Sequence, residues 1–412
     1  MRLVLIADDL TGAMDTGLQL AKCGLETLVP LSWQRLPEAE VVVVDTDSRA
    51  IRSTEARRRM ARVATMLDGR RLFKKVDSTM RGNVGFELRA LHDTLHPRRI
   101  VVAPAFPRGG RTTYWGYQRV DGQPLELTFF ARDPRWPMTE SHLPTLLMEQ
   151  SGLEVDTIGL DVVEGGMRSL CSALRDGVAP FVVVDALCDA HLVAIAEALL
   201  ELGEGWLPCG SAGLANAWAT ALGLCERPAE GYPPPSGLPV LMVSGSRNDV
   251  ALEQLDRLTV QRHLARVDLD PRRTYDLERE VSRLEAACRA ELEAGRDVIL
   301  TSSFASLIVG GGRLVAEALS ETVRRVVASC ELGGVFLTGG DIAVATCRRL
   351  DVHSLRIHAE VQAGIPGGQL IGGPADGLWV VTKAGGFGSP DAMIEALAYL
   401  RGESARPIVA TM

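Results

Sequence analysis

The segment LVLIADDLTGAMDTGLQLAKCG, residues 3–24, contains a strand and a helix in immediate succession at the start of the chain. Residues 3–7 are continuously apolar, as expected of a strand that is covered on both faces. The residues after Asp9 place apolar side chains at helical spacing, and Gly24 is typical of a helix C-terminus. This order predicts one strand–helix unit of a parallel α/β sheet.

The same alternation of apolar runs and helical stretches continues along the rest of the chain. Repeated alternation of this kind predicts a largely parallel sheet with helices on both faces. Further strands are expected at 41–49, 70–79, 98–106, 181–186, 240–246, 297–303, 333–341 and 377–388.

Two stretches interrupt this pattern. CERPAEGYPPPSGLPV, residues 225–240, is dense in Pro and Gly and is typical of a linker between domains. Residues 104–150 have no clear period, which favours a functional lid or binding loop. The sequence therefore predicts two doubly wound α/β domains with mostly parallel sheets, comprising residues 1–230 and 231–412.

Composition excludes several classes of function. The 412 residues carry a net charge of −8, so neither a nucleic acid nor a membrane surface is expected as a partner. The apolar start of the chain ends at Asp8 and is too short for a signal peptide or a membrane span. The oligomeric state stays open, with a homodimer as one option.

The eight cysteines show no CxxC pair and no regular spacing. This pattern predicts neither a disulfide framework nor a zinc site, and it suits a reducing cytosol. Cys23, Cys171 and Cys347 lie in apolar helical patterns, where a cysteine usually acts as a small core residue. A cytoplasmic location is the resulting expectation.

Charged and polar residues follow three expected strands of the first half. In parallel sheets the carboxyl ends of the strands share one edge, where ligands bind. Carboxylates there can accept hydrogen bonds from sugar hydroxyls, while Lys and Arg can hold a carboxylate or phosphate. Any single residue could equally be a helix cap or a solvated loop charge. The set comprises Asp8, Asp9, Asp45, Asp47, Ser48, Arg49, Lys75, Asp77, Ser78 and Arg81, and the expected fourth strand leads to Arg108 and Arg111.

Glycine-rich corners follow the strands of the second half instead: SGS (244–246), TGGD (338–341) and KAGGFG (383–388). Glycine allows a close approach of the backbone to a phosphate, and the start of the next helix offers free N–H donors. None of the three matches a Walker A loop or a dinucleotide fingerprint. Two readings stay open, namely nucleotide phosphate binding and simple closure of the corners between strands and helices.

Taken together, these motifs resemble those of the four-carbon acid sugar kinase family. The similarity covers nearly the whole chain in order. The segments that carry it are ADDLTGAMDTG, DTDSR, KKVDSTMRGN, PAFPRGGR, CGSAGLA, SGSRNDV, LTGGD and TKAGGFG.

The resemblance implies an N-terminal domain for the acid sugar, a C-terminal domain for the nucleotide, and ATP-dependent phosphorylation of a tetronate at its terminal hydroxyl. The implied substrate-binding residues are Asp8, Asp9, Arg49, Lys75, Asp77 and Arg81. The implied nucleotide-binding residues are Ser244, Ser246, Gly339, Gly340, Asp341, Ile342, Gly385, Gly386 and Gly388. Many members carry a GGETSGA-like stretch where this chain continues with Ile342 and Ala343, so side-chain contacts there are the least supported.

The expected mechanism is one of positioning and charge neutralisation, as in phosphoryl transfer generally. Arg49, Lys75 and Arg81 would hold the substrate carboxylate and balance the charge that develops on the phosphoryl group. Asp9 or Asp77 would accept the proton of the attacking hydroxyl. Mg²⁺ would be held by ATP oxygens, with no protein metal ligand predicted. Closure across residues 225–240 would exclude water.

Two other classes of function are compatible with part of the pattern. A dehydrogenase acting on a similar acid sugar would share the fold, although the chain has no GxGxxG fingerprint. A cytosolic sensor that only binds the acid sugar would share the charged strand ends, but it would not need glycine corners in the second half.

Overall fold

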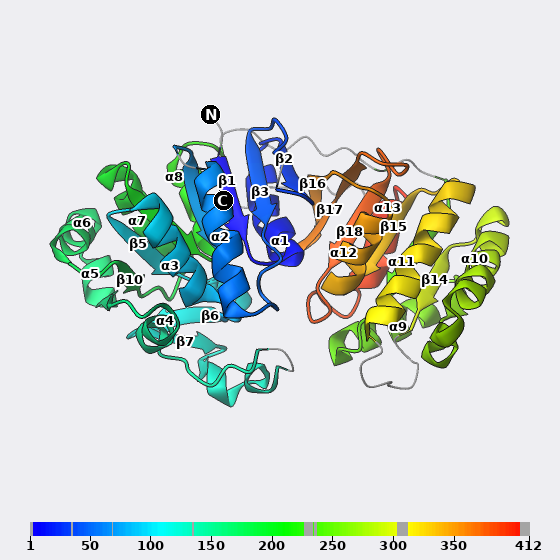
Figure 1. Cartoon of the computed structure of the whole chain (residues 1–412), viewed down its shortest axis with the longest axis horizontal. Helices are drawn as coiled ribbons and strands as arrows, with labels where there is room; N and C mark the ends of the chain where they lie inside the picture. The colour runs from blue at the N-terminus through cyan, green and yellow to red at the C-terminus, as the bar shows by residue number, and fades with distance from the viewer. Residues whose placement is uncertain are drawn as a thin grey trace. The chain divides into compact units, whose positions relative to one another are not determined.

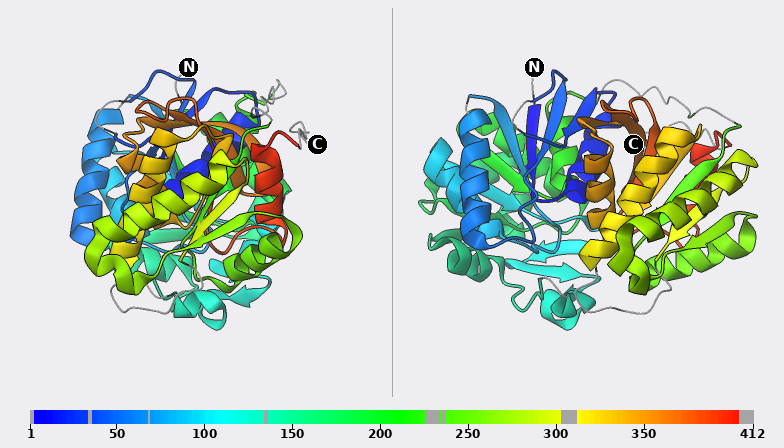
Figure 2. Two further views of the ribbon diagram at one scale, coloured as in Figure 1. Left: turned by 90° about the vertical axis from the view of Figure 1, so that its right-hand side faces the viewer. Right: turned by 45° about the vertical axis from the view of Figure 1, so that its right-hand side comes forward.

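The computed structural model describes residues 3–33, 36–67, 69–133, 136–225, 234, 237–302 and 312–403. The chain divides into two compact units, one of residues 1–27 and 33–227 and the other of residues 28–32 and 228–412. Both are α/β units with helices on the two faces of a mostly parallel sheet, as the sequence predicts (Figures 1 and 2). Among the described residues, no helix is both long and apolar enough to cross a membrane.

In the first unit all strands of the main sheet run parallel. Its residues 3–7 are all buried, which confirms a strand covered on both faces. The strands in spatial order are β3 (Val41–Asp45), β1 (Leu3–Ala7), β4 (Arg71–Lys75), β11 (Trp206–Gly210), β5 (Arg99–Ala103), β10 (Phe181–Val184) and β9 (Val155–Ile158).

The helices of this unit pack in two rows, α2–α3–α4 and α1–α8–α7–α6. Alternate strand residues such as Val4 and Ile6 join the core formed with α2, α3 and α4. Because the side chains of a strand alternate between faces, its other residues face the second row. The helices are α1 (Leu10–Ala21), α2 (Ser53–Leu67), α3 (Val84–Leu95), α4 (Leu143–Ser151), α5 (Leu160–Glu164), α6 (Met167–Asp176), α7 (Asp189–Leu202) and α8 (Ala212–Ala221).

Residues 104–150, expected to be irregular, contain a small antiparallel sheet and the helix α4. The sheet consists of β6 (Arg111–Tyr114), β7 (Tyr117–Val120) and β8 (Gln123–Pro124). Trp115 and Gly116 connect its first two strands, both with positive φ, as in a tight hairpin turn. Strands of two to four residues are too short to show a period, which explains why the sequence did not reveal them.

The sheet of the second unit is parallel on one side and antiparallel on the other. Its strands in order are β13 (Ala265–Asp268), β14 (Val298–Thr301), β12 (Val240–Ser244), β15 (Gly334–Thr338), β18 (Trp379–Lys383), β17 (Ile365–Ile371), β16 (Ser354–Gln362) and β2 (Thr27–Pro30). Its helices are α9 (Asp249–Gln261), α10 (Leu277–Glu293), α11 (Gly312–Ser329), α12 (Gly340–Arg349) and α13 (Ala392–Leu400). Helices α9 and α13 pack together, while α10, α11 and α12 form a separate row.

Strand β2 comes from the start of the chain, but its residues 28–30 belong to the second unit. It pairs antiparallel with β16, so that Val29 lies opposite Leu355. The division predicted at 230/231 assigns residues 28–32 to the first domain, whereas the structure groups them with the second unit.

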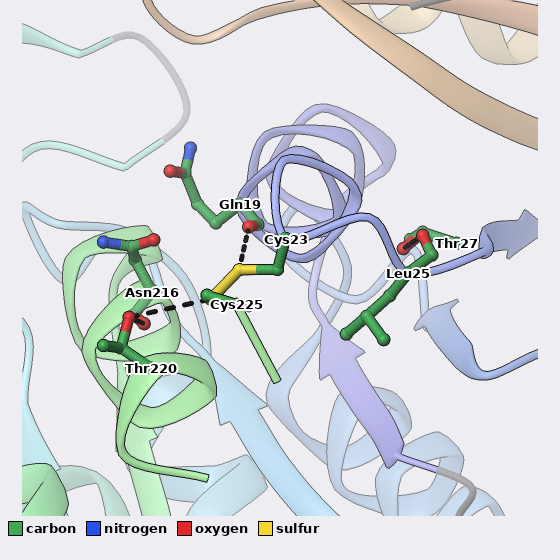
Figure 3. The surroundings of a disulfide bond; sticks show 7 residues. All are labelled: Gln19, Cys23, Leu25, Thr27, Asn216, Thr220 and Cys225. Atoms are coloured by element: carbon green, nitrogen blue, oxygen red, sulfur yellow. Dashed lines mark hydrogen bonds between the residues drawn. A yellow bond between two sulfur atoms is a disulfide. The ribbon is translucent and has the colours of Figure 1, made fainter. Parts of the chain in front are cut away.

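The expectation for Cys23 was wrong. Cys23, just beyond α1, forms a disulfide with Cys225, which follows α8 (Figure 3). Packing of α1 against α8 brings the two residues together although 202 positions separate them in the sequence. Cys171 and Cys347 are free and buried, which confirms their reading as core residues.

Candidate functional site

The charged residues predicted at the strand ends of the first unit lie at the ends of three neighbouring strands. Asp8 and Asp9 follow β1, Arg49 lies four residues after β3, and Asp77 lies two residues after β4. The amides of Ser48 and Arg49 both donate to the carbonyl of Asp8, at 2.9 and 3.0 Å. This backbone pairing fixes the loop after β3 against the end of β1.

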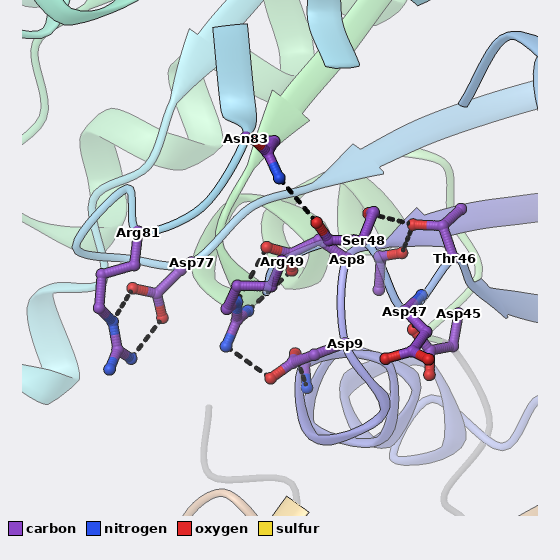
Figure 4. A network of polar contacts seen from close by, with 12 residues as sticks. Asp8, Asp9, Asp45, Thr46, Asp47, Ser48, Arg49, Asp77, Arg81 and Asn83 are labelled. Atoms are coloured by element: carbon purple, nitrogen blue, oxygen red, sulfur yellow. Dashed lines mark hydrogen bonds and ion pairs between the residues drawn. The ribbon is translucent and has the colours of Figure 1, made fainter. Parts of the chain in front are cut away.

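Arg49 is bonded to both aspartates at the end of β1 (Figure 4). Its Nε and Nη2 donate to the two carboxylate oxygens of Asp8, at 2.9 and 2.7 Å. Its Nη1 donates to Asp9 Oδ2 at 2.5 Å. Bidentate pairing of this kind fixes the plane of the guanidinium as well as its position.

The two aspartates differ in the net direction of their pKa shift. Burial raises the pKa of Asp8, but the charge and hydrogen bonds of Arg49, together with Lys74 and Lys75, outweigh it and hold the pKa below its usual value. For Asp9 burial dominates, and with the charge of Asp8 it raises the pKa despite Arg49. Asp9 is therefore the stronger proton acceptor of the two.

Asp9 also caps α1, since its Oδ1 accepts from the amide of Gly12 at 2.8 Å. This cap places the carboxylate at the helix N-terminus, where a negative charge is favoured.

Asp77 and Arg81 form a second ion pair of this site. Arg81 donates from Nε and Nη2 to the two oxygens of Asp77, at 2.8 and 3.1 Å, and Thr79 donates to the same carboxylate. Arg81 Nη1 reaches Asp133 at 3.0 Å, and its guanidinium lies 4.9 Å from the centre of the Phe130 ring. Burial raises the pKa of Asp77, but Arg81 and Arg49 hold it well below its usual value.

Lys75, the last residue of β4, is 4% exposed and lies beside this network. A Cβ atom placed on Gly12 would lie 2.7 Å from Asp9 Oδ1, 3.1 Å from Lys75 Nζ and 3.6 Å from an Arg49 nitrogen. The side chain of Lys75 makes no hydrogen bond or ion pair with any residue that the structure describes. Its ammonium is thus the cation of the cluster that is available to an anionic ligand.

The close fit around Gly12 gives a first prediction. In Gly12→Ala the added methyl group must displace Asp9 or Lys75, so we expect kcat/KM for the acid substrate to fall at least about tenfold, the size of a misplaced catalytic group. Affinity for the nucleotide should not change. Gly312→Ala is the matched control, because a Cβ there meets no atom within 4 Å. Equal activity of the two variants would contradict the tight fit.

Lys74, the neighbour of Lys75, is fully buried on the other face of β4. Its Nζ lies 2.8 Å from Glu87 of α3, and Glu87 also accepts from Ser48, next to Arg49. The Lys74–Glu87 pair thus supports the loop that carries Arg49 from behind.

Sequence reasoning missed four residues at or behind this site, and two of them carried a signal. Gly12 and Gly82 lie inside the motifs quoted above, and a Cβ on Gly82 would lie 3.1 Å from both Arg49 and Asp8, at a φ of 107°. Glu87 and Asp133 could not be identified from the sequence, because no motif links Glu87 to Lys74 or Asp133 to Arg81.

In the second unit the glycine corners also lie against one another. A Cβ on Gly385 would lie 2.3 Å from Ser246 Oγ, and one on Gly245 would lie 2.9 Å from Ile342 Cδ1. The amide of Gly339, which has a φ of 102°, donates to the carbonyl of Lys383 at 3.1 Å. The ends of β12, β15 and β18 therefore form one glycine-lined edge.

The predicted nucleotide residues occupy different places at this edge. Gly339 caps α12, and Asp341 lies in the first turn of that helix. Ser244 and Ile342 are buried, Ile342 against the Gly245 corner, so their side chains are packing residues of the edge. Gly385, Gly386 and Gly388 lie in the loop that follows β18.

Both halves of the chain are similar to known protein domains. Residues 3–218 match the model of a sugar-binding N-terminal domain, and residues 241–393 match that of a nucleotide-binding C-terminal domain. A D-threonate kinase of Salmonella typhimurium strain LT2 is 36% identical over 97% of this chain and 98% of its own length. The chain belongs to the four-carbon acid sugar kinase family.

Other relatives fit this acid sugar kinase family. A D-erythronate kinase of Heliobacterium modesticaldum is 32% identical, and a 3-oxo-tetronate kinase of Pseudomonas fluorescens is 29% identical, covering 96% and 97% of this chain and 96% and 97% of their own lengths. A solved structure of a Salmonella typhimurium protein, described as a putative tRNA synthase, has a TM-score of 0.81 at 23% identity. It covers 96% of this chain and 98% of that one. It shares the fold.

Proposed function

We propose that the chain is an ATP-dependent kinase that phosphorylates a four-carbon sugar acid at its terminal 4-hydroxyl. The first unit binds the acid, and the second binds the nucleotide through Ser246 and the glycine corners at 339–340 and 385–388. The observation that carries this proposal is the Asp8–Arg49–Asp9 network with Lys75 beside it, because it combines an available cation with an aspartate of raised pKa.

Within this site we assign Asp9 the role of general base. A general base accepts a proton in the reaction, and its efficiency rises as its pKa approaches the working pH. Asp77 meets this requirement poorly, since Arg81 and Arg49 hold its pKa well below the usual value, whereas the pKa of Asp9 is raised. Asp77 instead holds Arg81 in place.

Lys75 then binds the anionic group of the substrate. Arg49 and Arg81 already donate to aspartates, so their charge acts on the ligand while their position is fixed. Charge that is fixed in advance costs no rearrangement during the reaction. We also propose that Mg²⁺ would bind with the nucleotide and neutralise part of the charge on its phosphates. A homodimer and a cytoplasmic location remain proposals made from the sequence.

A panel of four-carbon acids tests the function. D-threonate, L-threonate, D-erythronate, L-erythronate and 3-oxo-tetronate are each incubated with ATP, and ADP formation and product mass are measured. We expect saturable ADP formation with at least one acid and a product heavier by one phosphoryl group. Reduction of a nicotinamide cofactor with these acids would instead support a dehydrogenase, and binding without turnover would support a sensor.

A further inference from the structure

The loop at 384–389, which follows β18 in the second unit, is held by the side chain of a buried lysine. Lys383 ends β18 and is 3% exposed. Its Nζ donates to the carbonyls of Ala384, Gly385 and Phe387, at 2.9, 3.0 and 3.0 Å. All three donors of the ammonium group are therefore used on one short loop.

A second buried side chain holds the rest of the loop. Gln254 of α9 is fully buried, and its Nε2 lies within hydrogen-bond distance of the carbonyls of Phe387, Gly388 and Ser389, at 3.0, 3.2 and 2.8 Å. Lys383 and Gln254 together contact the carbonyls of five residues of the loop, and both side chains reach it from the protein interior.

This arrangement leaves the amide groups of the loop available. The amides of Gly385, Gly386 and Gly388 make no hydrogen bond with any described residue. Backbone amides that are left free in a glycine turn form a concave site that favours an anion. The φ of Gly388 is 87°, which other residues rarely adopt, and a Cβ on Gly385 would collide with Ser246, so larger residues are disfavoured at both positions.

Lysine at this position is unusual for this chain. Only four of its 44 basic residues are lysines, at positions 22, 74, 75 and 383, and Lys383 is the one in the second half. Among the described residues, no carboxylate pairs with it. A compact ammonium can serve several carbonyls at once, which the planar fork of arginine cannot do in the same space. Burial lowers the pKa of Lys383 to about 8, so the group stays largely charged at neutral pH.

We propose that Lys383 and Gln254 are positioning residues that turn the carbonyls of residues 384–389 inward and thereby present the loop amides to a nucleotide phosphate. The inference rests on the proposed function, because it assumes that the second unit binds ATP. Neither side chain touches the nucleotide in this proposal, and both act through the shape of the loop.

The test compares Lys383→Met and Gln254→Leu with Gln369→Leu. Gln369 is the matched control, since it donates to the carbonyl of Gly377, away from the loop. Affinities for ATP, ADP and adenosine are measured by calorimetry, and KM and kcat are measured for both substrates. Loss of a hydrogen bond that involves a charged group lowers binding affinity by a factor of about ten.

We expect Lys383→Met and Gln254→Leu to weaken ATP and ADP binding at least about tenfold while adenosine binding and KM for the acid stay unchanged. In Lys383→Ala, an added alkylamine should restore part of the ATP affinity by filling the position of the ammonium. A general loss of folding would not show this rescue. Gln254→Leu provides a second test if the lysine variants do not fold.

The outcomes separate the two proposals. If wild-type protein does not bind ATP, the proposed function fails. If wild-type protein binds ATP and both variants bind it equally well, the role of Lys383 and Gln254 is refuted while the proposed function stands. An equal loss of adenosine and ATP affinity would also refute the role, because adenosine has no phosphate for the loop amides to bind.

Discussion

Replacement of Asp9 by Asn is expected to lower kcat by about a hundredfold to ten-thousandfold, the usual contribution of a general base. Asparagine keeps the cap of α1, because its side-chain oxygen can still accept from the amide of Gly12. It removes the proton acceptor and one negative charge beside Arg49. Affinity for ATP should not change, since the predicted nucleotide residues lie in the second unit.

The comparison with Asp77→Asn identifies which aspartate is the base. That variant loosens Arg81, so we expect a raised KM for the acid and a smaller effect on kcat at saturating acid. Asp276→Asn makes the same change at the N-cap of α10 and serves as the control for capping. If Asp77→Asn abolishes turnover while Asp9→Asn leaves it within a few-fold, Asp77 is the base and our assignment is wrong.

The pH dependence of kcat gives a second measurement of the same role. Asp9 must be ionised to accept a proton, and burial raises its pKa above the usual 3.8. Activity should therefore fall as the pH is lowered through this raised pKa, at a higher pH than for an ordinary aspartate. The acidic limb should disappear in Asp9→Asn, whose residual activity no longer depends on that group.

Much of the fold and of the charged cluster could be predicted from the sequence. Continuous apolar runs such as residues 3–7 identify buried parallel strands, and their carboxyl ends must share one edge of the sheet. The motif around Lys75, Asp77 and Arg81 then predicts a ligand site at that edge.

What the sequence did not show has physical reasons. The strand β2 (Thr27–Pro30) is four residues long, so no period distinguishes it from a loop, and its partner β16 lies over 300 positions away. The pairing of Cys23 with Cys225 depends on the packing of α1 against α8, which cysteine spacing does not encode. Alternation along β4 shows that Lys74 and Lys75 face opposite sides, but it cannot show that Glu87 lies opposite Lys74.

Replacement of Arg49 by Met should destabilise the first unit by about 3–5 kcal/mol at pH 7, the cost of leaving a buried charge unpaired. Asp8 is 2% exposed and Arg49 19% exposed, so water cannot replace the guanidinium at Asp8. Arg57→Met is the control, because Arg57 pairs with Asp93 on the surface, where an ion pair contributes about 0–1 kcal/mol. Urea unfolding of both variants and the wild type measures the difference.

The sign of the pH effect distinguishes lost charge pairing from lost packing. In the wild type the folded-state pKa of Asp8 is depressed, so this group stabilises the fold above its unfolded pKa of 3.8 and loses that contribution as the pH falls. Without Arg49 the largest remaining influence is burial, which raises the pKa, so the variant loses stability as the pH rises. The difference in the free energy of unfolding between Arg49→Met and the wild type should therefore be smaller at pH 5 than at pH 7.

The double variant Asp8→Asn, Arg49→Met completes the argument, because it removes the stranded charge along with its partner. It should recover a large part of the stability that Arg49→Met loses, since an amide at position 8 costs far less to bury than a carboxylate. A difference that is the same at pH 5 and pH 7, with no recovery in the double variant, would mean that Arg49 stabilises the unit through its packing alone. In that case the charge pairing on which the proposed site depends would have no energetic support.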